Sequence, residues 1–199
     1  IKIEFDLIAP SLNYQEYVLN NVQTIGDFSH NLLTIDSLYF ENMDEEAHVE
    51  MDYDFTIRDG RFHVDSDIHI QKFVLTFFNR ELFKGFNING GSEINAKGYF
   101  KLPTKIDDKS FAVVLPSFIN PFAELEIKAM GNVKLTSYEY LGSEFDSFNS
   151  DFSWNNGDVY LDNLDVQNPA GYLRGRLLIK NNIVSTFIIL TFVIVVNIL

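Results

Sequence analysis

Apolar and polar residues alternate along most of the chain with a period of two, which is typical of strands that have one apolar face. The clearest run extends from Glu46 to Arg58, and the alternation resumes from Phe62 to Ile70. Asp59-Gly60 lies between the two runs, and an Asp-Gly pair in this position predicts a β-hairpin with a two-residue turn. Folding about this turn places apolar residues opposite one another, pairing Ile57 with Phe62, Phe55 with Val64, and Met51 with Ile68.

The same alternation predicts further strands downstream. They cover residues 94–102, 123–135 and 172–180, and a run from Phe148 to Trp154 that leads into Asn156-Gly157, a second hairpin turn. After that turn Val159 and Leu161 keep the phase, whereas Leu164 and Val166 have the opposite parity. This change of phase predicts a β-bulge near Asn163.

Helices are scarce in this pattern. Only residues 13–22 (Asn13 to Val22) and 79–86 (Asn79 to Phe86) are expected as short helices, and neither has a wide apolar stripe. Residues 103–121 are expected to form a loop around one short strand at 111–115. The fold class is therefore mostly β, a long antiparallel meander.

With so little helix, the apolar faces of the strands need another cover. The meander curls either into an open trough, a β-groove whose apolar lining is covered by something other than protein, or into a closed β-sandwich sealed by a second sheet. Small residues on the apolar faces leave room along the floor of a trough, or mark strand crossings and bulges in a sandwich. They are Ala96, Gly98, Ala129 and Gly131.

Composition narrows the possible functions. The 199 residues include 28 acidic and 15 basic side chains, a net charge of −13, and no cysteine. This charge excludes a typical nucleic-acid binder, which needs clustered Lys and Arg, and the lack of cysteine excludes disulfides and Cys-ligated metals. The chain begins at Ile1 in a strand pattern, so we expect a fragment, with one β domain at 1–182 and an apolar tail at 183–199.

The tail, IVSTFIILTFVIVVNIL, is uncharged. As a helix it would span about 26 Å, close to the ~30 Å of a bilayer core, and we favour a membrane-inserted segment. Arg174, Arg176 and Lys180 precede it, which by the positive-inside rule places the β domain on the cytoplasmic side. Its many Ile, Val and Thr residues favour strands instead, so two buried strands or one membrane-contacting strand remain alternatives.

Acidic residues crowd the polar face of the first hairpin. In the predicted register Asp54 faces Asp65 and Asp52 faces Asp67, and such opposed like charges destabilise a sheet. A bound Ca²⁺ would relieve the repulsion, and a solvated acidic face is the alternative. Sequence motifs for a nucleophile, a phosphate-binding loop or a zinc site are missing, so we expect neither an enzyme nor a cofactor.

The sequence of residues 154–179 is WNNGDVYLDNLDVQNPAGYLRGRLLI. This segment resembles the C-terminal region of AsmA-like proteins, a bacterial envelope family that includes the TamB-type translocation and assembly module. In that family a strand, a Gly turn, a Leu-x-Asn-Leu strand and a Gly-x-x-x-Gly strand recur in this order. The matching positions are Trp154, Gly157, Leu161, Leu164, Gly171, Leu173 and Gly175.

The resemblance implies a curled β-sheet trough that carries lipid between membranes or serves outer-membrane assembly. Its partners would be phospholipid, the membrane and other envelope proteins, with the domain in the periplasm, which conflicts with the basic flank of the tail. The lipid groove would be lined by Val49, Met51, Tyr53, Phe55, Val64, Ile68, Leu125, Ile127 and Val133. The alternative function is a membrane-tethered β-sandwich for adhesion or scaffolding, whose acidic face binds Ca²⁺ or a partner.

Overall fold

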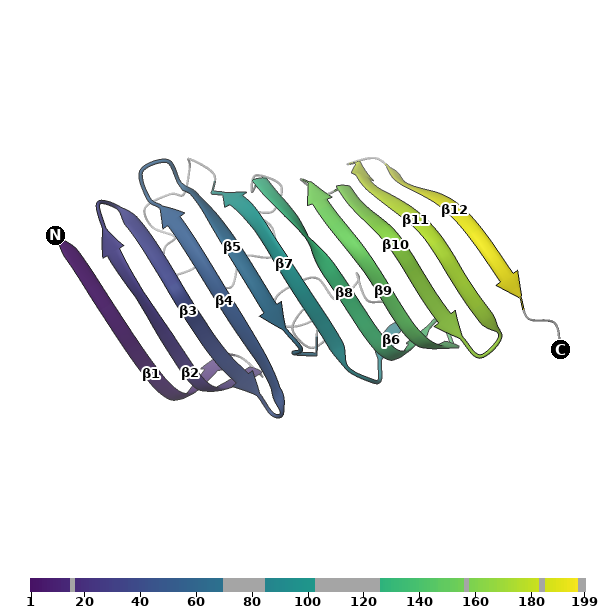
Figure 1. The fold of residues 1–199 in the computed structure, drawn as a ribbon, viewed down its shortest axis with the longest axis horizontal. Helices are drawn as coiled ribbons and strands as arrows, with labels where there is room; N and C mark the ends of the chain where they lie inside the picture. Colours follow the sequence, from purple (N-terminus) through teal and green to yellow (C-terminus); the bar gives the residue numbers. More distant parts are fainter. Residues whose placement is uncertain (15–16, 70–84, 103–125, 156–157, 183–184, 197–199) are drawn as a thin grey trace.

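The computed structural model describes residues 1–14, 17–69, 85–102, 126–155, 158–182 and 185–196, and these form one β-sheet (Figure 1). The strands are β1 (Lys2–Tyr14), β2 (Tyr17–Ser29), β3 (Leu32–Asn42), β4 (Glu45–Asp54), β5 (Asp59–Ser66), β6 (Phe86–Ile88), β7 (Ser92–Lys101), β8 (Glu126–Tyr140), β9 (Ser143–Asn155), β10 (Asp158–Asn168), β11 (Gly171–Asn182) and β12 (Ser185–Val196).

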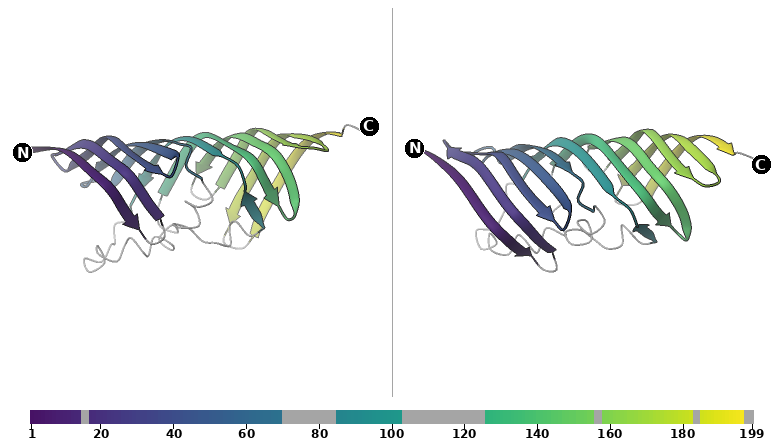
Figure 2. Two further views of the ribbon diagram at one scale, coloured as in Figure 1. Left: turned by 90° about the horizontal axis from the view of Figure 1, so that it is seen from below. Right: turned by 60° about the horizontal axis from the view of Figure 1, so that its bottom comes forward.

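The sheet is an open antiparallel meander. Its order is β1-β2-β3-β4-β5-β7-β8-β9-β10-β11-β12. The short strand β6 pairs with the end of β8, on the same edge of β8 as β7. The strands bow and the sheet twists along its length, with the two chain ends at opposite ends of the molecule (Figure 2). The predicted mostly-β meander is thus confirmed in its open form. Within the described residues there is one sheet and no second layer, so the closed β-sandwich is not formed.

Tight turns connect several strands. His30 and Asn31 both have positive φ, 50° and 65°, and join β2 to β3 in two residues. Leu141 and Gly142, with φ of 51° and 82°, join β8 to β9 in the same way. Two successive left-handed residues give the turn whose twist matches that of the flanking strands. The strands β9 and β10 pair from Asn155 and Asp158 onward, so the hairpin predicted around Asn156-Gly157 is confirmed.

The first predicted hairpin exists, but its register is wrong. The strands β4 and β5 pair Met51 with Phe62 and Asp54 with Asp59, so the turn is residues 55–58 and not Asp59-Gly60. The Asp54 carboxylate accepts the backbone N–H groups of residues 56 and 57 at 2.7 and 3.3 Å, and Arg58 takes a positive φ of 59°. An Asp side chain that holds the start of a turn in this way fixes where the strand ends.

Two irregularities have local causes. The register of β10 shifts on both sides at Asn163, whose φ is 53°, so the predicted bulge is confirmed. In β8 the pairing passes from β7 to β6 around Ser137, which has a φ of 50° and whose carbonyl accepts N–H groups from Asn89 and Gly90. The short strand β6 therefore continues the line of β7 along β8.

Two other expectations differ from the structure, and others fall on residues that the structure does not describe. Residues 13–22 are not a helix, because described residues on both sides of 15–16 belong to β1 and β2. Residues 79–84 and the segment 103–121 lie outside the described part, and β6 begins at Phe86. The tail is not a helix either: residues 185–196 form β12, paired with β11 along its whole length. Among the described residues no helix has the length and apolar character needed to cross a membrane.

The sheet has little enclosed core. Among the residues whose side chains the structure describes, which exclude β12, nine hydrophobic side chains are buried, in small groups such as Ala47 with Ile68 and Ile88 with Leu135. The protein exposes 13783 Å² of surface, whereas a closed monomer of 22.9 kDa exposes about 9600 Å². An extended single sheet contributes to this excess, since each strand is covered mainly by its two neighbours.

Candidate functional site

The candidate site is the apolar face of the sheet, defined here by the side chains that share a face with Met51. Pairing places Met51, Phe62, Gly98, Ala129 and Trp154 in one row across β4, β5, β7, β8 and β9. The next rows run from Tyr53 to Ile127 and from Val49 to Phe152. The face is therefore continuous over five strands.

Most of the residues predicted to line the groove lie on this face. Those within its strands are Val49, Met51, Tyr53, Val64, Ile127 and Val133. Ile68 follows β5 and is buried against Ala47. Phe55 is not a strand residue: it lies in the 55–58 turn, 46% exposed. Leu125 lies outside the described residues.

Phenylalanine rings fill the space above the small residues. A Cβ added to Gly98 would lie 2.7 Å from the Phe62 ring, and one added to Gly60 would lie 2.6 Å from the Phe100 ring. The same relation recurs between Gly26 and Phe5, at 2.8 Å. The expectation that Gly98 leaves room along the floor is thus wrong. Each of these glycines accommodates a ring from a neighbouring strand, a pattern known to stabilise glycine in sheets.

Two groups of aromatic side chains lie at separate places on the sheet. In the first, Tyr53 stacks on Phe100 at 5.7 Å and meets Phe55 edge-on at 4.7 Å, and Phe28 contacts Phe55 at 5.8 Å. Such aromatic pairs each contribute about 0.5–1.5 kcal/mol beyond the area they bury. Through these contacts the turn residue Phe55 packs against the strand residues Tyr53 and Phe28, whereas the predicted register had placed Phe55 within a strand.

The second aromatic group surrounds Tyr138. Its ring stacks on Phe145 at 4.9 Å and meets Phe148 edge-on at 6.4 Å. Burial raises the pKa of Tyr138 to about 12, so its phenol stays neutral over the physiological range. The sequence had offered no reason to single out Tyr138, because in a regular alternation it has the opposite parity to Leu135. In the structure Ser137, with its left-handed backbone, lies between them, and Leu135 and Tyr138 belong to the same buried cluster.

The opposite, polar face carries charges of both signs. The observed register pairs Asp52 with Arg61, Glu50 with His63, and His48 with Asp65. The predicted oppositions of Asp54 with Asp65 and of Asp52 with Asp67 are therefore wrong. Arg61 now lies opposite Asp52, and histidines lie opposite Glu50 and Asp65, so the two carboxylate pairs that a Ca²⁺ ion was invoked to relieve are not formed. The register instead sets Asp54 opposite Asp59 at the turn, where the Asp54 carboxylate accepts backbone N–H groups.

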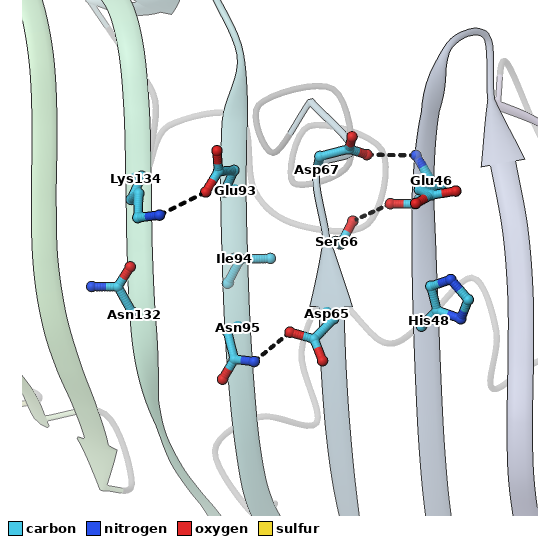
Figure 3. Close-up of a pocket in the computed structure, with 10 residues that line it drawn as sticks. All are labelled: Glu46, His48, Asp65, Ser66, Asp67, Glu93, Ile94, Asn95, Asn132 and Lys134. Carbon is cyan, nitrogen blue, oxygen red and sulfur yellow. Dashed lines mark hydrogen bonds and ion pairs between the residues drawn. The ribbon is translucent and has the colours of Figure 1, made fainter.

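A shallow hollow of about 280 Å³ lies on the polar face across β4, β5, β7 and β8 (Figure 3). Several of its polar groups are bound to one another. Lys134 pairs with Glu93 at 2.8 Å, Asp67 accepts the backbone N–H of Glu46 at 2.5 Å, and Asp65 accepts from the Asn95 amide. Within the described ranges, no three His, Asp or Glu side chains are arranged to hold a metal ion.

An Asn-rich row crosses the polar face farther along. The Asn163 amide donates to Asp151 at 2.6 Å, and the Asn132 amide donates to Asp151 at 3.2 Å. These two hydrogen bonds, the one from Asn163 first, lower the pKa of the Asp151 carboxyl below its ordinary value. The polar face is thus a hydrogen-bonded surface in which side-chain amides donate to carboxylates on neighbouring strands.

Comparison with models of protein families, with curated proteins and with solved structures finds no match to this chain. The arguments that follow therefore rest on the sequence and on the geometry of the two faces.

Proposed function

We propose that this protein is a non-enzymatic lipid carrier of a bacterial cell envelope, whose apolar sheet face holds the acyl chains of phospholipid. The observation that carries the proposal is the continuous apolar face of a single open sheet, together with about 4000 Å² more exposed surface than a closed monomer has. Exposure of such a face to water is unfavourable, and contact with acyl chains removes it from water. Transfer along it needs no bond to be made or broken.

The energetics favour a linear apolar ligand. Each CH₂ group that is fully removed from water gains about 0.8 kcal/mol, and one that lies with a single side against the face gains part of this, so a chain lying across several strands gains several kcal/mol in total. Phe62 over Gly98 and Phe100 over Gly60 make this part of the face even rather than hollow. An even apolar surface suits an extended acyl chain better than a compact ligand that needs a deep pocket.

The resemblance of residues 154–179 to AsmA-like proteins supports a periplasmic site next to a membrane and partners among other envelope proteins. The strand β12 also bears on this, because the conflict over sidedness arose from treating residues 183–199 as a membrane helix. With those residues in a strand, the positive-inside argument from Arg174 and Arg176 no longer applies.

The test is native mass spectrometry with lipid extraction on the full chain purified from a bacterial host. We expect phospholipid at close to stoichiometric amounts. Ile127→Asp places a charge on the apolar face of β8 and should abolish lipid binding. Met130→Asp is the matched control. Met130 lies on the same strand but on the polar face, where it is 56% exposed, and the substitution likewise replaces an apolar side chain by a carboxylate.

Circular dichroism separates the possible outcomes. A folded Ile127→Asp variant without lipid, beside a folded Met130→Asp variant with lipid, supports the proposal. A folded wild-type chain that carries no lipid, or lipid retained equally by both variants, would show that the apolar face is not a lipid site. If Ile127→Asp unfolds, the milder Val133→Thr, which keeps the shape of the side chain, should lower lipid occupancy while the sheet remains intact.

A further inference from the structure

The connection between β6 and β7 combines a reactive dipeptide with close packing against β8. Residues 89–91 are Asn-Gly-Gly, and they lie beside Thr136 and Ser137 of β8. A Cβ added to Gly90 would overlap the carbonyl oxygen of Thr136, so the close approach requires glycine. Asparagine is a thermolabile residue, and a following glycine exposes it most to deamidation because no side chain hinders the glycine nitrogen. The feature that lets the connection approach β8 therefore also leaves Asn89 open to attack.

Deamidation begins with attack on the asparagine side chain by the next backbone nitrogen. The Gly90 nitrogen loses its proton to a solvent base and forms a bond to Cγ of Asn89, and the side-chain nitrogen takes up a proton and leaves as ammonia. Water then opens the cyclic imide at either carbonyl, which gives aspartate or isoaspartate. In sum, asparagine and water become an acidic residue and ammonia. The attack needs a free Gly90 N–H and a carboxamide that can turn towards it.

In the structure both reacting groups have other partners. The Gly90 N–H donates to the carbonyl oxygen of Ser137 at 2.9 Å. The side-chain oxygen of Asn89 accepts the Asn87 amide at 2.8 Å, which fixes the carboxamide. The backbone N–H of Asn89 also donates to the Ser137 carbonyl oxygen, at 2.7 Å. The nucleophile and the group that it would attack are therefore both held apart from the reaction.

The next residue closes the connection onto β8. The Gly91 N–H donates to the Thr136 hydroxyl at 2.9 Å, and the Gly91 carbonyl oxygen accepts the Thr136 backbone N–H at 2.9 Å. We propose that Asn89 is a deamidation site that these contacts with β8 hold inactive, so that reaction requires residues 89–91 to leave β8. Such a local opening frees the Gly90 nitrogen without unfolding the sheet. The site does not depend on the proposed lipid function.

Conversion of Asn89 to isoaspartate releases β6. Isoaspartate carries the chain through its side-chain carbon, which adds one methylene to the backbone between β6 and β7. Both strands pair with β8 in a fixed register, β6 through Ile88 with Tyr138 and β7 through Ser92 with Leu135. The longer connection no longer fits β8, and β6, with three residues, is the part that detaches. Its release exposes Ile88 and Tyr138, which are 4% and 5% exposed in the intact sheet.

The test measures deamidation of Asn89 by mass spectrometry of peptides from the full chain, incubated at mildly alkaline pH. The reference is the rate at the same residue in the chain unfolded by urea. We expect the folded chain to react about tenfold more slowly or slower still, because tenfold corresponds to about 1.4 kcal/mol, close to the net contribution of one hydrogen bond. A folded wild-type chain that reacts as fast as the unfolded one overturns the proposal.

A pair of variants at Thr136 identifies the contacts that control the rate. Thr136→Val removes the hydroxyl that accepts the Gly91 N–H and keeps the branched shape, so Asn89 should react several-fold faster with unchanged circular dichroism. Thr136→Ser keeps the hydroxyl and should react at the wild-type rate. Equal rates in the two variants would show that β8 does not control the site. If Thr136→Val loses its structure, the ratio of folded to unfolded rates in the wild type still decides.

Hydrogen exchange tests the release of β6. The wild-type chain is aged until isoaspartate has formed at Asn89, and the exchange of the backbone amides of residues 86–88 is compared with that of the fresh protein. We expect faster exchange in these residues of the aged protein and unchanged exchange in β7. Protection of residues 86–88 that is the same before and after isoaspartate formation would refute the release of β6.

Discussion

Replacement of Gly98 by alanine tests how closely the backbone of β8 and the ring of Phe62 pack against β7 on the apolar face. A Cβ at this position would overlap the carbonyl oxygen of Lys128 and lie 2.7 Å from the ring of Phe62. The ring could turn away, but the carbonyl belongs to β8, which pairs with β7 on both sides of this point. The overlap must therefore be relieved by separating two paired strands.

Two effects of opposite sign set the magnitude. Alanine restricts the unfolded chain and on that ground stabilises the protein by about 0.4–1 kcal/mol. Overpacking against fixed neighbours typically costs about 1–3 kcal/mol. Because the closest neighbour is backbone, we expect the second effect to dominate and Gly98→Ala to lower the free energy of unfolding by about 1–2 kcal/mol.

Trp154 provides the assay. It is the one tryptophan of the chain and lies in the same row as Gly98, two strands away through Ala129. Its fluorescence during urea unfolding therefore reports on this part of the sheet. Gly91→Ala is the control, since the nearest atom to its Cβ, the Thr136 hydroxyl, is 3.5 Å away. The double variant with Phe62→Leu should recover part of the loss. If Gly98→Ala is as stable as Gly91→Ala, the packing argument is wrong.

Two further variants test the polar groups of β9. Ser150 is fully buried, with its hydroxyl 2.9 Å from the carbonyl oxygens of Asp151 and Asp162, so Ser150→Ala should cost about 1–2 kcal/mol in urea unfolding, while Ser153→Ala changes little. Asn163→Gly keeps the left-handed backbone but removes a donor to Asp151, so the pKa of Asp151 should rise in a carbon-detected NMR titration. Because the pKa of Asp151 is lowered in the folded protein, the wild type should be more stable than Asn163→Gly at pH 7, and this difference should disappear as the pH falls below about 4. A difference in stability that persists at pH 2 would contradict this.

Alternation of apolar and polar residues predicts the faces of the strands but not their register. Pairing Met51 with Ile68 or with Phe62 puts the same side chains on the same face, so the hydrophobic pattern cannot distinguish the two. The turn decides between them. The capping of the turn by the Asp54 carboxylate and the left-handed backbone of Arg58 favour residues 55–58 over the Asp-Gly pair that the sequence rule prefers.

The candidate site was predictable in outline for the same reason. Val49, Val64 and Val133 share a face whatever the register, whereas the position of Phe55 depends on where the strand ends. Whether the Phe62 ring occupies the space over Gly98 depends on which residues are cross-strand neighbours, and a linear pattern does not contain this information. The strand form of residues 185–196 was one of several alternatives, because an uncharged apolar run suits a membrane helix and an interior strand alike.

The order of the strands has a consequence for how such a protein can change in evolution. Along the main path each strand pairs with the strand that precedes it and the one that follows it, apart from the small β6. Duplication or loss of one hairpin would therefore lengthen or shorten the sheet by two strands. Every other strand would keep its direction and its face, and only the two strands that flank the change would gain a new partner. Gain of a single strand would reverse the direction of all that follow. The length of the sheet can thus be adjusted in steps of one hairpin, much as the length of a repeat protein is adjusted by whole repeats.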